Sequence, residues 1–162
     1  LGLAVVALAW PLWQRRAELQ RRAAAIVIAA LAGGAAAAAS AVALGWALGL
    51  PHEVLMSLAP KSVTAPVAMG IAEQIGGIPA LAAAFAVLTG MVGAVSAKYL
   101  FDALRVTAPA VRGFALGTTS HGLGAARALQ VDADAGAYAG LALGLQVVLA
   151  ALLLPLAFRY FA

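Results

Sequence analysis

The sequence predicts an all-α, polytopic transmembrane helical bundle that contains two broken or re-entrant helical hairpins. Hydrophobic residues make up 65% of its 162 residues and charged residues only 10%, whereas a soluble domain carries roughly a quarter charged residues. The charges are clustered, which leaves uncharged runs at 23–52, 74–97 and 135–158. Each run exceeds the ~20 residues that cross a hydrocarbon core. Between the runs lie two apolar segments whose middles are polar and rich in proline or glycine.

The chain begins with an apolar segment, 1–13, that is only about 20 Å long as a helix and therefore too short to span a bilayer. No basic region precedes it, so it does not read as a signal peptide. We expect it to be the end of a spanning helix, in a single transmembrane domain, 1–162, that is shortened at its N-terminus. The next segment, 14–22, carries Arg15, Arg16, Arg21 and Arg22. Short arginine-rich loops stay cytoplasmic.

The remaining elements alternate between clean and broken. A long alanine-rich span is expected over 23–50, and clean spans follow at 78–97 and 136–158. The broken segments are 54–75, interrupted by Pro60 and Pro66, and 106–130, interrupted around Ser120. Proline removes a backbone donor and clashes with the preceding turn. The exposed backbone groups must then be satisfied by protein or water, which predicts that both breaks are buried among neighbouring helices.

Two topologies remain for the broken segments. If each is a re-entrant hairpin, the single helix between them makes them enter from opposite sides, in an inverted arrangement with both tips near the midplane. Lys98 and Arg105 then lie on the same side as the four arginines, as the positive-inside rule prefers. If the broken segments cross instead, these two residues lie outside. We favour the re-entrant version.

Lys61 lies too deep in the first broken segment to belong to a loop. A cation there costs roughly 2.5–3.5 kcal/mol, and such residues usually line a cavity or pathway. The alternatives are a snorkelling side chain or an ion pair with Glu53 or Glu73. Ser62 and Thr64 follow the break as candidate N-caps. A half-helix N-terminus beside a lysine favours an anion such as a carboxylate.

The same reasoning applies at the second break, where hydroxyl side chains precede glycines that permit close backbone approach. Arg112 and Arg127 bracket this stretch and could add positive charge. The candidate substrate-binding residues here are Thr119, Ser120, His121 and Gly122.

Two residues are candidates for proton coupling. His121 could bind substrate or take up a proton near neutral pH, and a neutral, hydrogen-bonded histidine at a helix break is an equal alternative. Glu73 could carry a proton or pair with Lys61.

Residue content argues against several functional classes. The chain has no cysteine and only two, widely separated histidines, so thiolate or histidine metal sites are not expected. Ser120 beside His121 does not indicate a hydrolase, because nucleophile, base and orienting acid must meet in space. No basic stripe alternates with aromatic residues, as nucleic-acid binding would require. We therefore expect no enzyme activity, no cofactor, no metal and no nucleic-acid partner.

Three stretches carry a family resemblance. "SLAPKSVTAPVAMGIAEQIGGIPALAAAFAVLTGMVGA" (57–94) and "RGFALGTTSHGLGAARAL" (112–129) resemble the LrgB/CidB membrane protein family. The opening "LGLAVVALAWPLW" is similar to that family's "LGPATVALAxPLY". Members are longer at the N-terminus, which agrees with the shortened domain expected above.

The resemblance implies transport of small 2-hydroxy or 2-oxo monocarboxylates. The plant branch of the family is a chloroplast-envelope glycolate/glycerate transporter. Bacterial members act with a small holin-like partner, LrgA or CidA, and are linked to pyruvate uptake and to control of murein hydrolase activity and autolysis.

Two functions therefore remain: a secondary transporter of small monocarboxylates, and a holin-like or antiholin-like pore component. A transporter needs a specific midplane site, which the paired breaks would supply, so we favour it. The expected surroundings are a lipid bilayer, most simply a bacterial plasma membrane, and we also expect a homo-oligomer.

Overall fold

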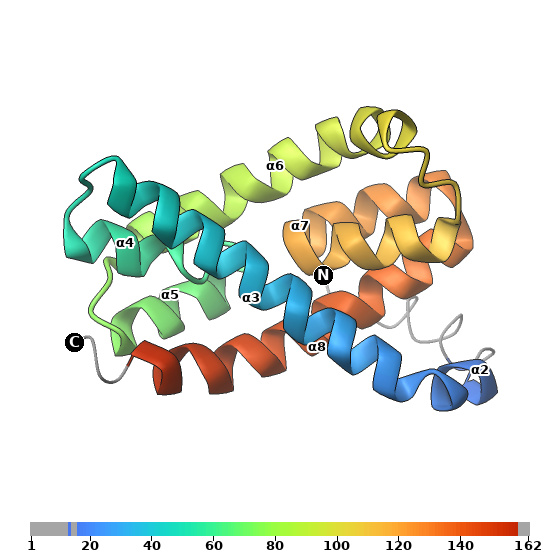
Figure 1. The fold of residues 1–162 in the computed structure, drawn as a ribbon, viewed down its shortest axis with the longest axis horizontal. Helices are drawn as coiled ribbons and strands as arrows, with labels where there is room; N and C mark the ends of the chain where they lie inside the picture. Colours follow the sequence, from blue (N-terminus) through green and yellow to red (C-terminus); the bar gives the residue numbers. More distant parts are fainter. Residues whose placement is uncertain (1–12, 14–15, 159–162) are drawn as a thin grey trace.

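The computed structural model describes Trp13 and residues 16–158, and Figure 1 shows their arrangement. These residues form no strand and seven helices: α2 (Arg16–Arg21), α3 (Ala23–Ala47), α4 (His52–Leu58), α5 (Ala65–Gln74), α6 (Pro79–Ala103), α7 (Pro109–Val131) and α8 (Ala133–Phe158). The predicted all-α class is confirmed. Apart from Trp13, the predicted helix end at 1–13 lies outside the described residues, as does Arg15.

Three helices are long and apolar enough to cross a membrane: α3, α6 and α8, with 25, 25 and 26 residues. Large apolar side chains on these helices are exposed, for example Leu44, Val95 and Leu152. This is the expected surface of helices that face lipid, where apolar side chains carry no penalty. The three predicted spans are therefore confirmed as membrane-length helices.

Both broken segments form hairpins, at opposite ends of the bundle (Figure 1). Helices α4 and α5 lie at the end where α3 finishes and α6 begins, and the two limbs of α7 lie side by side at the other end. Helix α7 is interrupted at Ser120 and His121, whose backbone angles are not helical. With 7 and 10 residues, α4 and α5 are too short to span. Both segments thus have the hairpin shape that the favoured re-entrant version requires, while their return to the same membrane face and their relation as an inverted repeat stay predictions.

Helices α3, α5 and α6 end where the chain reverses sharply. Gly49, Gly76 and Arg105 have positive φ angles of 71°, 80° and 55°. In each case the next N–H bonds back to a carbonyl five residues earlier, as in Val106 N to Phe101 O at 2.9 Å. This is the Schellman ending of a helix.

The largest differences from the expected helix limits lie at the end of α6 and in the arginine-rich segment. Helix α6 continues to Ala103, past the predicted end at residue 97, because charged residues in its last turns are exposed and do not stop a helix. The arginine-rich segment is partly helical, as α2, rather than a loop throughout.

Two clusters of small and branched side chains hold the hairpins in place. One joins the first hairpin to α6 and includes Leu55, Val63, Ile71 and Ala86. The other joins α7 to α8 through residues such as Leu116 and Ala139.

Candidate functional site

The tip of the first hairpin, residues 59–64, contains two backbone hydrogen bonds that each join residues three apart. Lys61 N bonds to Leu58 O at 3.1 Å and Val63 N to Pro60 O at 3.2 Å. Pro60 and Val63 are buried, so the tip lies inside the protein. Thr64 occupies the N-cap position of α5, as predicted, but its side chain makes no capping hydrogen bond.

Lys61 is half-buried at this tip, beside a serine. Its Nζ lies 3.3 Å from Ser62 Oγ. An ammonium group only donates, so Ser62 Oγ accepts this bond and its own O–H remains available to another acceptor. Within residues 16–158, Lys61 forms no ion pair with Glu53 or Glu73, and both carboxylates are exposed.

A cavity of about 400 Å³ lies against this tip, within the range of ~300–1,000 Å³ typical of small-molecule sites. Its walls come from α3, from the hairpin tip and from α8. Most of the lining is alanine and leucine, and the only polar side chains in it are Ser62 and Gln146. Lys61 is not in the wall; it lies behind Ser62.

Gln146 was not anticipated from the sequence. It lies in the middle of α8, is 3% exposed, and its Nε2 donates to Ala30 O of α3 at 2.6 Å. Gly34 leaves the space for it, since a Cβ at position 34 would lie 2.9 Å from Nε2 and closer still to Oε1. One feature of the sequence could have identified it: Gln146 is the lone amide side chain within the uncharged run 135–158. Polar groups inside a span are costly and usually functional.

The second hairpin packs its backbone directly on α8. Cβ atoms added at Gly113 and Gly117 would collide with the backbones of Ala135 and Ala139. His121 forms the break with φ 42° and ψ −134°, a region that residues with a Cβ rarely adopt. Strain of this kind costs about 1–3 kcal/mol and persists only where surrounding contacts impose it.

The hydroxyl groups of this hairpin bond mainly to its own backbone. Thr118 donates to Phe114 O at 2.8 Å, and Thr119 donates to Ala115 O at 2.9 Å. Because the Thr119 hydrogen is used in this way, Ser120 Oγ donates to Thr119 Oγ1 at 3.3 Å. The hydroxyl groups of Thr118 and Ser120 thus bond within the hairpin itself, and Thr119 is exposed.

His121 is buried and links the second hairpin to α6. Its Nε2 lies 2.7 Å from Ala86 O. A carbonyl only accepts, so Nε2 carries the hydrogen, and in the neutral ring Nδ1 is an acceptor. Among the described residues Nδ1 has no hydrogen-bond partner. Every fully buried side-chain nitrogen or oxygen among them does have a partner, so Nδ1 is not fully buried. Nδ1 therefore reaches open space.

The two breaks are connected through the spanning helices. The Ala86 side chain packs with the first hairpin, while its carbonyl accepts the bond from His121. On α3, Gly33 lies against Thr118 and the adjacent Gly34 against Gln146. However, none of the cavity's lining residues comes from α7, so the cavity belongs to the first hairpin rather than to both.

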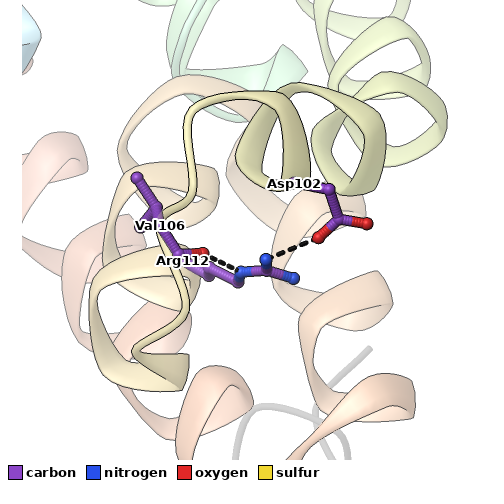
Figure 2. A network of polar contacts seen from close by, with 3 residues as sticks. All are labelled: Asp102, Val106 and Arg112. Atoms are coloured by element: carbon purple, nitrogen blue, oxygen red, sulfur yellow. Dashed lines mark hydrogen bonds and ion pairs between the residues drawn. The ribbon is translucent and has the colours of Figure 1, made fainter.

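The remaining predicted residues lie away from the cavity wall. Arg112 bridges the end of α6 and the following loop: its Nη2 lies 2.6 Å from Asp102 Oδ1, and its Nε donates to Val106 O (Figure 2). Arg127 is exposed on the second limb of α7, and Glu73 is exposed near the end of α5. Half-buried Gly122 follows His121, and a Cβ there would meet no atom within 4 Å. No group of three metal-ligating side chains occurs among residues 16–158.

Comparison with known proteins places these features in a family. The family model described as the LrgB-like family matches residues 1–160. An uncharacterised protein of Haemophilus influenzae is 31% identical over 159 residues, which is 98% of this chain and 69% of the relative. Bacillus subtilis YxaC is 33% identical over 96% of this chain and 68% of its own. The "Holin-like protein CidB" of Staphylococcus aureus is 27% identical over 96% and 68%. No solved structure matches.

Proposed function

The chain belongs to the LrgB-like family of membrane proteins, and we propose that it is a secondary transporter that carries small monocarboxylates across a bilayer. The observation that carries this proposal is the cavity of about 400 Å³ at the tip of the first hairpin. Ser62 forms part of its wall and Lys61 stands directly behind Ser62. A pore built only from packed helices has no need of such a site.

The chemistry at this tip suits a carboxylate. Ser62 accepts a hydrogen bond from the Lys61 ammonium, which polarises the Ser62 O–H toward an acceptor in the cavity. Hydrogen bonds to charged acceptors are shorter and stronger than neutral ones. Helix α5 begins just after the tip, and the first N–H groups of a helix favour negative charge. The alanine-rich remainder of the wall suits a small, mostly apolar carbon skeleton.

His121 is the proposed proton carrier. Its Nε2 is held by Ala86 O, and Nδ1 remains able to accept a proton. Protonation would place a positive charge on a ring anchored to α6, which also packs on the first hairpin. Coupling between the two breaks would then pass through the Ala86 turn of α6. In this proposal Thr64, Gly122, Arg112, Arg127 and Glu73 remain secondary candidates for binding or proton transfer.

The test is uptake of labelled glycolate, lactate and pyruvate by proteoliposomes that contain purified protein. Lys61→Ala and His121→Ala should each reduce uptake at least tenfold, since a hydrogen bond to a charged group contributes about 1.5–3 kcal/mol and 1.4 kcal/mol corresponds to a factor of ten. Lys98→Ala and His52→Ala remove an exposed lysine and an exposed histidine and should leave uptake unchanged. Full-rate uptake by both Lys61→Ala and His121→Ala would show that the proposed transport site is wrong.

A second function, a holin-like or antiholin-like membrane component, is favoured by the printed name of the Staphylococcus relatives, "Holin-like protein CidB". In that role the chain would assemble with copies of itself or with a small LrgA/CidA-like membrane protein, in a bacterial plasma membrane. Graded leakage of dyes of increasing size from the same proteoliposomes would support this role. A transporter retains the dyes while it takes up the acids.

A further inference from the structure

Gln146 is the one polar side chain of a spanning helix that lines the cavity. It is 3% exposed and lines the cavity from α8, whereas Ser62 lines it from the hairpin tip. Its amide orientation is determined by chemistry: Ala30 O, 2.6 Å away, can only accept, so the nitrogen faces α3. The amide oxygen, Oε1, lies against Gly34 of α3, which also lines the cavity.

Oε1 has no hydrogen-bond partner among the described residues. No fully buried side-chain oxygen there lacks a partner, so Oε1 must reach open space, and the space that Gln146 borders is the cavity. An amide oxygen with free lone pairs in an otherwise apolar wall is a hydrogen-bond acceptor for whatever occupies the cavity. Leaving it unmatched would cost about 1–3 kcal/mol.

We propose that Gln146 is a specificity-determining residue, which selects 2-hydroxy acids over 2-oxo acids by accepting a hydrogen bond from the 2-hydroxyl group. This inference rests on the proposed transport of monocarboxylates. A 2-hydroxy acid can direct its carboxylate to Ser62 and donate its hydroxyl hydrogen to Oε1. A 2-oxo acid has only acceptors at that position, so its oxygen would face the lone pairs of Oε1.

The experiment measures the ratio of low-concentration uptake of lactate to that of pyruvate in proteoliposomes. The wild-type protein should favour lactate. Gln146→Leu should lower the ratio about threefold to tenfold, the effect of one neutral hydrogen bond. Ala30 O keeps its ordinary partner within α3, so leucine leaves no orphaned carbonyl. The matched control is Gln74→Leu, because Gln74 Nε2 also donates to a helix carbonyl, Gly70 O at 3.1 Å, but is exposed. This control should keep the wild-type ratio.

A second measurement needs no variant. Unlabelled lactate should inhibit labelled lactate uptake by the wild-type protein more strongly than propionate does, because propionate has the same skeleton without the hydroxyl group. If Gln146 only clamps α8 to α3, Gln146→Leu will reduce uptake of both acids equally and leave the ratio unchanged.

The outcomes separate the two proposals. Saturable uptake with an unchanged ratio in Gln146→Leu, a wild-type preference for pyruvate, or equal inhibition by lactate and propionate overturns the role of Gln146 and leaves the transporter standing. Absence of saturable uptake of either acid by the wild-type protein overturns the proposed function and this inference with it.

Discussion

Replacing Gly117 by alanine should weaken the attachment of the second hairpin to α8. Gly113 and Gly117 are one turn apart on α7, and both touch the α8 backbone, at Ala135 and Ala139. Small residues four apart are the usual way in which membrane helices approach so closely. The contact positions the hairpin that carries His121, so it bears on the site as well as on stability.

The magnitude follows from the contact. A Cβ at position 117 would lie 2.7 Å from Ala139 Cα and closer still to its carbonyl oxygen, about 1 Å inside the ~3.5–4.0 Å separation of carbon atoms in contact. Both obstacles are backbone atoms, so no side chain can move aside. Overpacking of this kind costs about 1–3 kcal/mol.

Gly144→Ala on α8 is the matched control, because a Cβ there meets no atom within 4 Å. Both changes replace a helical glycine by alanine, so the helix propensity gain of about 1 kcal/mol cancels between them. Gly117→Ala should therefore be less stable than Gly144→Ala by about 1–3 kcal/mol. At ~2–4 °C per kcal/mol for a chain of this size, thermal unfolding in detergent, followed by tryptophan fluorescence, should separate them. If Gly117→Ala melts at or above the control, the close helix contact is wrong.

Two further predictions concern the first hairpin and the topology. Ser57→Ala should destabilise the protein by about 1–3 kcal/mol, because buried Ser57 Oγ accepts a hydrogen bond from Ile78 N at 2.8 Å. The control, Ser96→Ala, removes an exposed hydrogen bond within one helix and should change stability by less than about 0.5 kcal/mol. Thermal unfolding compares the two variants. Because the sequence has no cysteine, single cysteines report sidedness cleanly: His52→Cys and Glu73→Cys should react with a membrane-impermeant maleimide from one side and Arg105→Cys from the other. Labelling of positions 52 and 73 from opposite sides would show that the first broken segment crosses the bilayer.

The positions of spans and breaks could be predicted because they depend on local energetics. A charge within hydrocarbon is costly wherever it lies, so each uncharged run contains most of one span: α3, α6 or α8. Proline and clustered hydroxyl groups interrupt a helix through their own backbone chemistry. Residues 54–75 and 106–130 therefore contained both hairpins, and Thr64 was correctly placed at a helix start.

The composition of the site could not be predicted in the same way. Thr119, Ser120 and Ser62 look equivalent in sequence, yet only Ser62 borders the cavity, while the other two bond within α7. Arg112 could equally have faced a substrate, and the structure pairs it with Asp102. Which acceptor a polar side chain meets depends on neighbouring elements, and local sequence does not contain that information.

Sequence by itself determined that this chain is a bundle of spanning helices with two interrupted segments, since the exclusion of charges and unpaired backbone groups from lipid acts residue by residue. Only the tertiary structure decided what lies beside each interruption. Gln146 bonds to Ala30, 116 residues away, and His121 bonds to Ala86 on α6, 35 residues away. Such pairs arise from close packing of helices distant in sequence, where a glycine at position 34 or 90 leaves the necessary space.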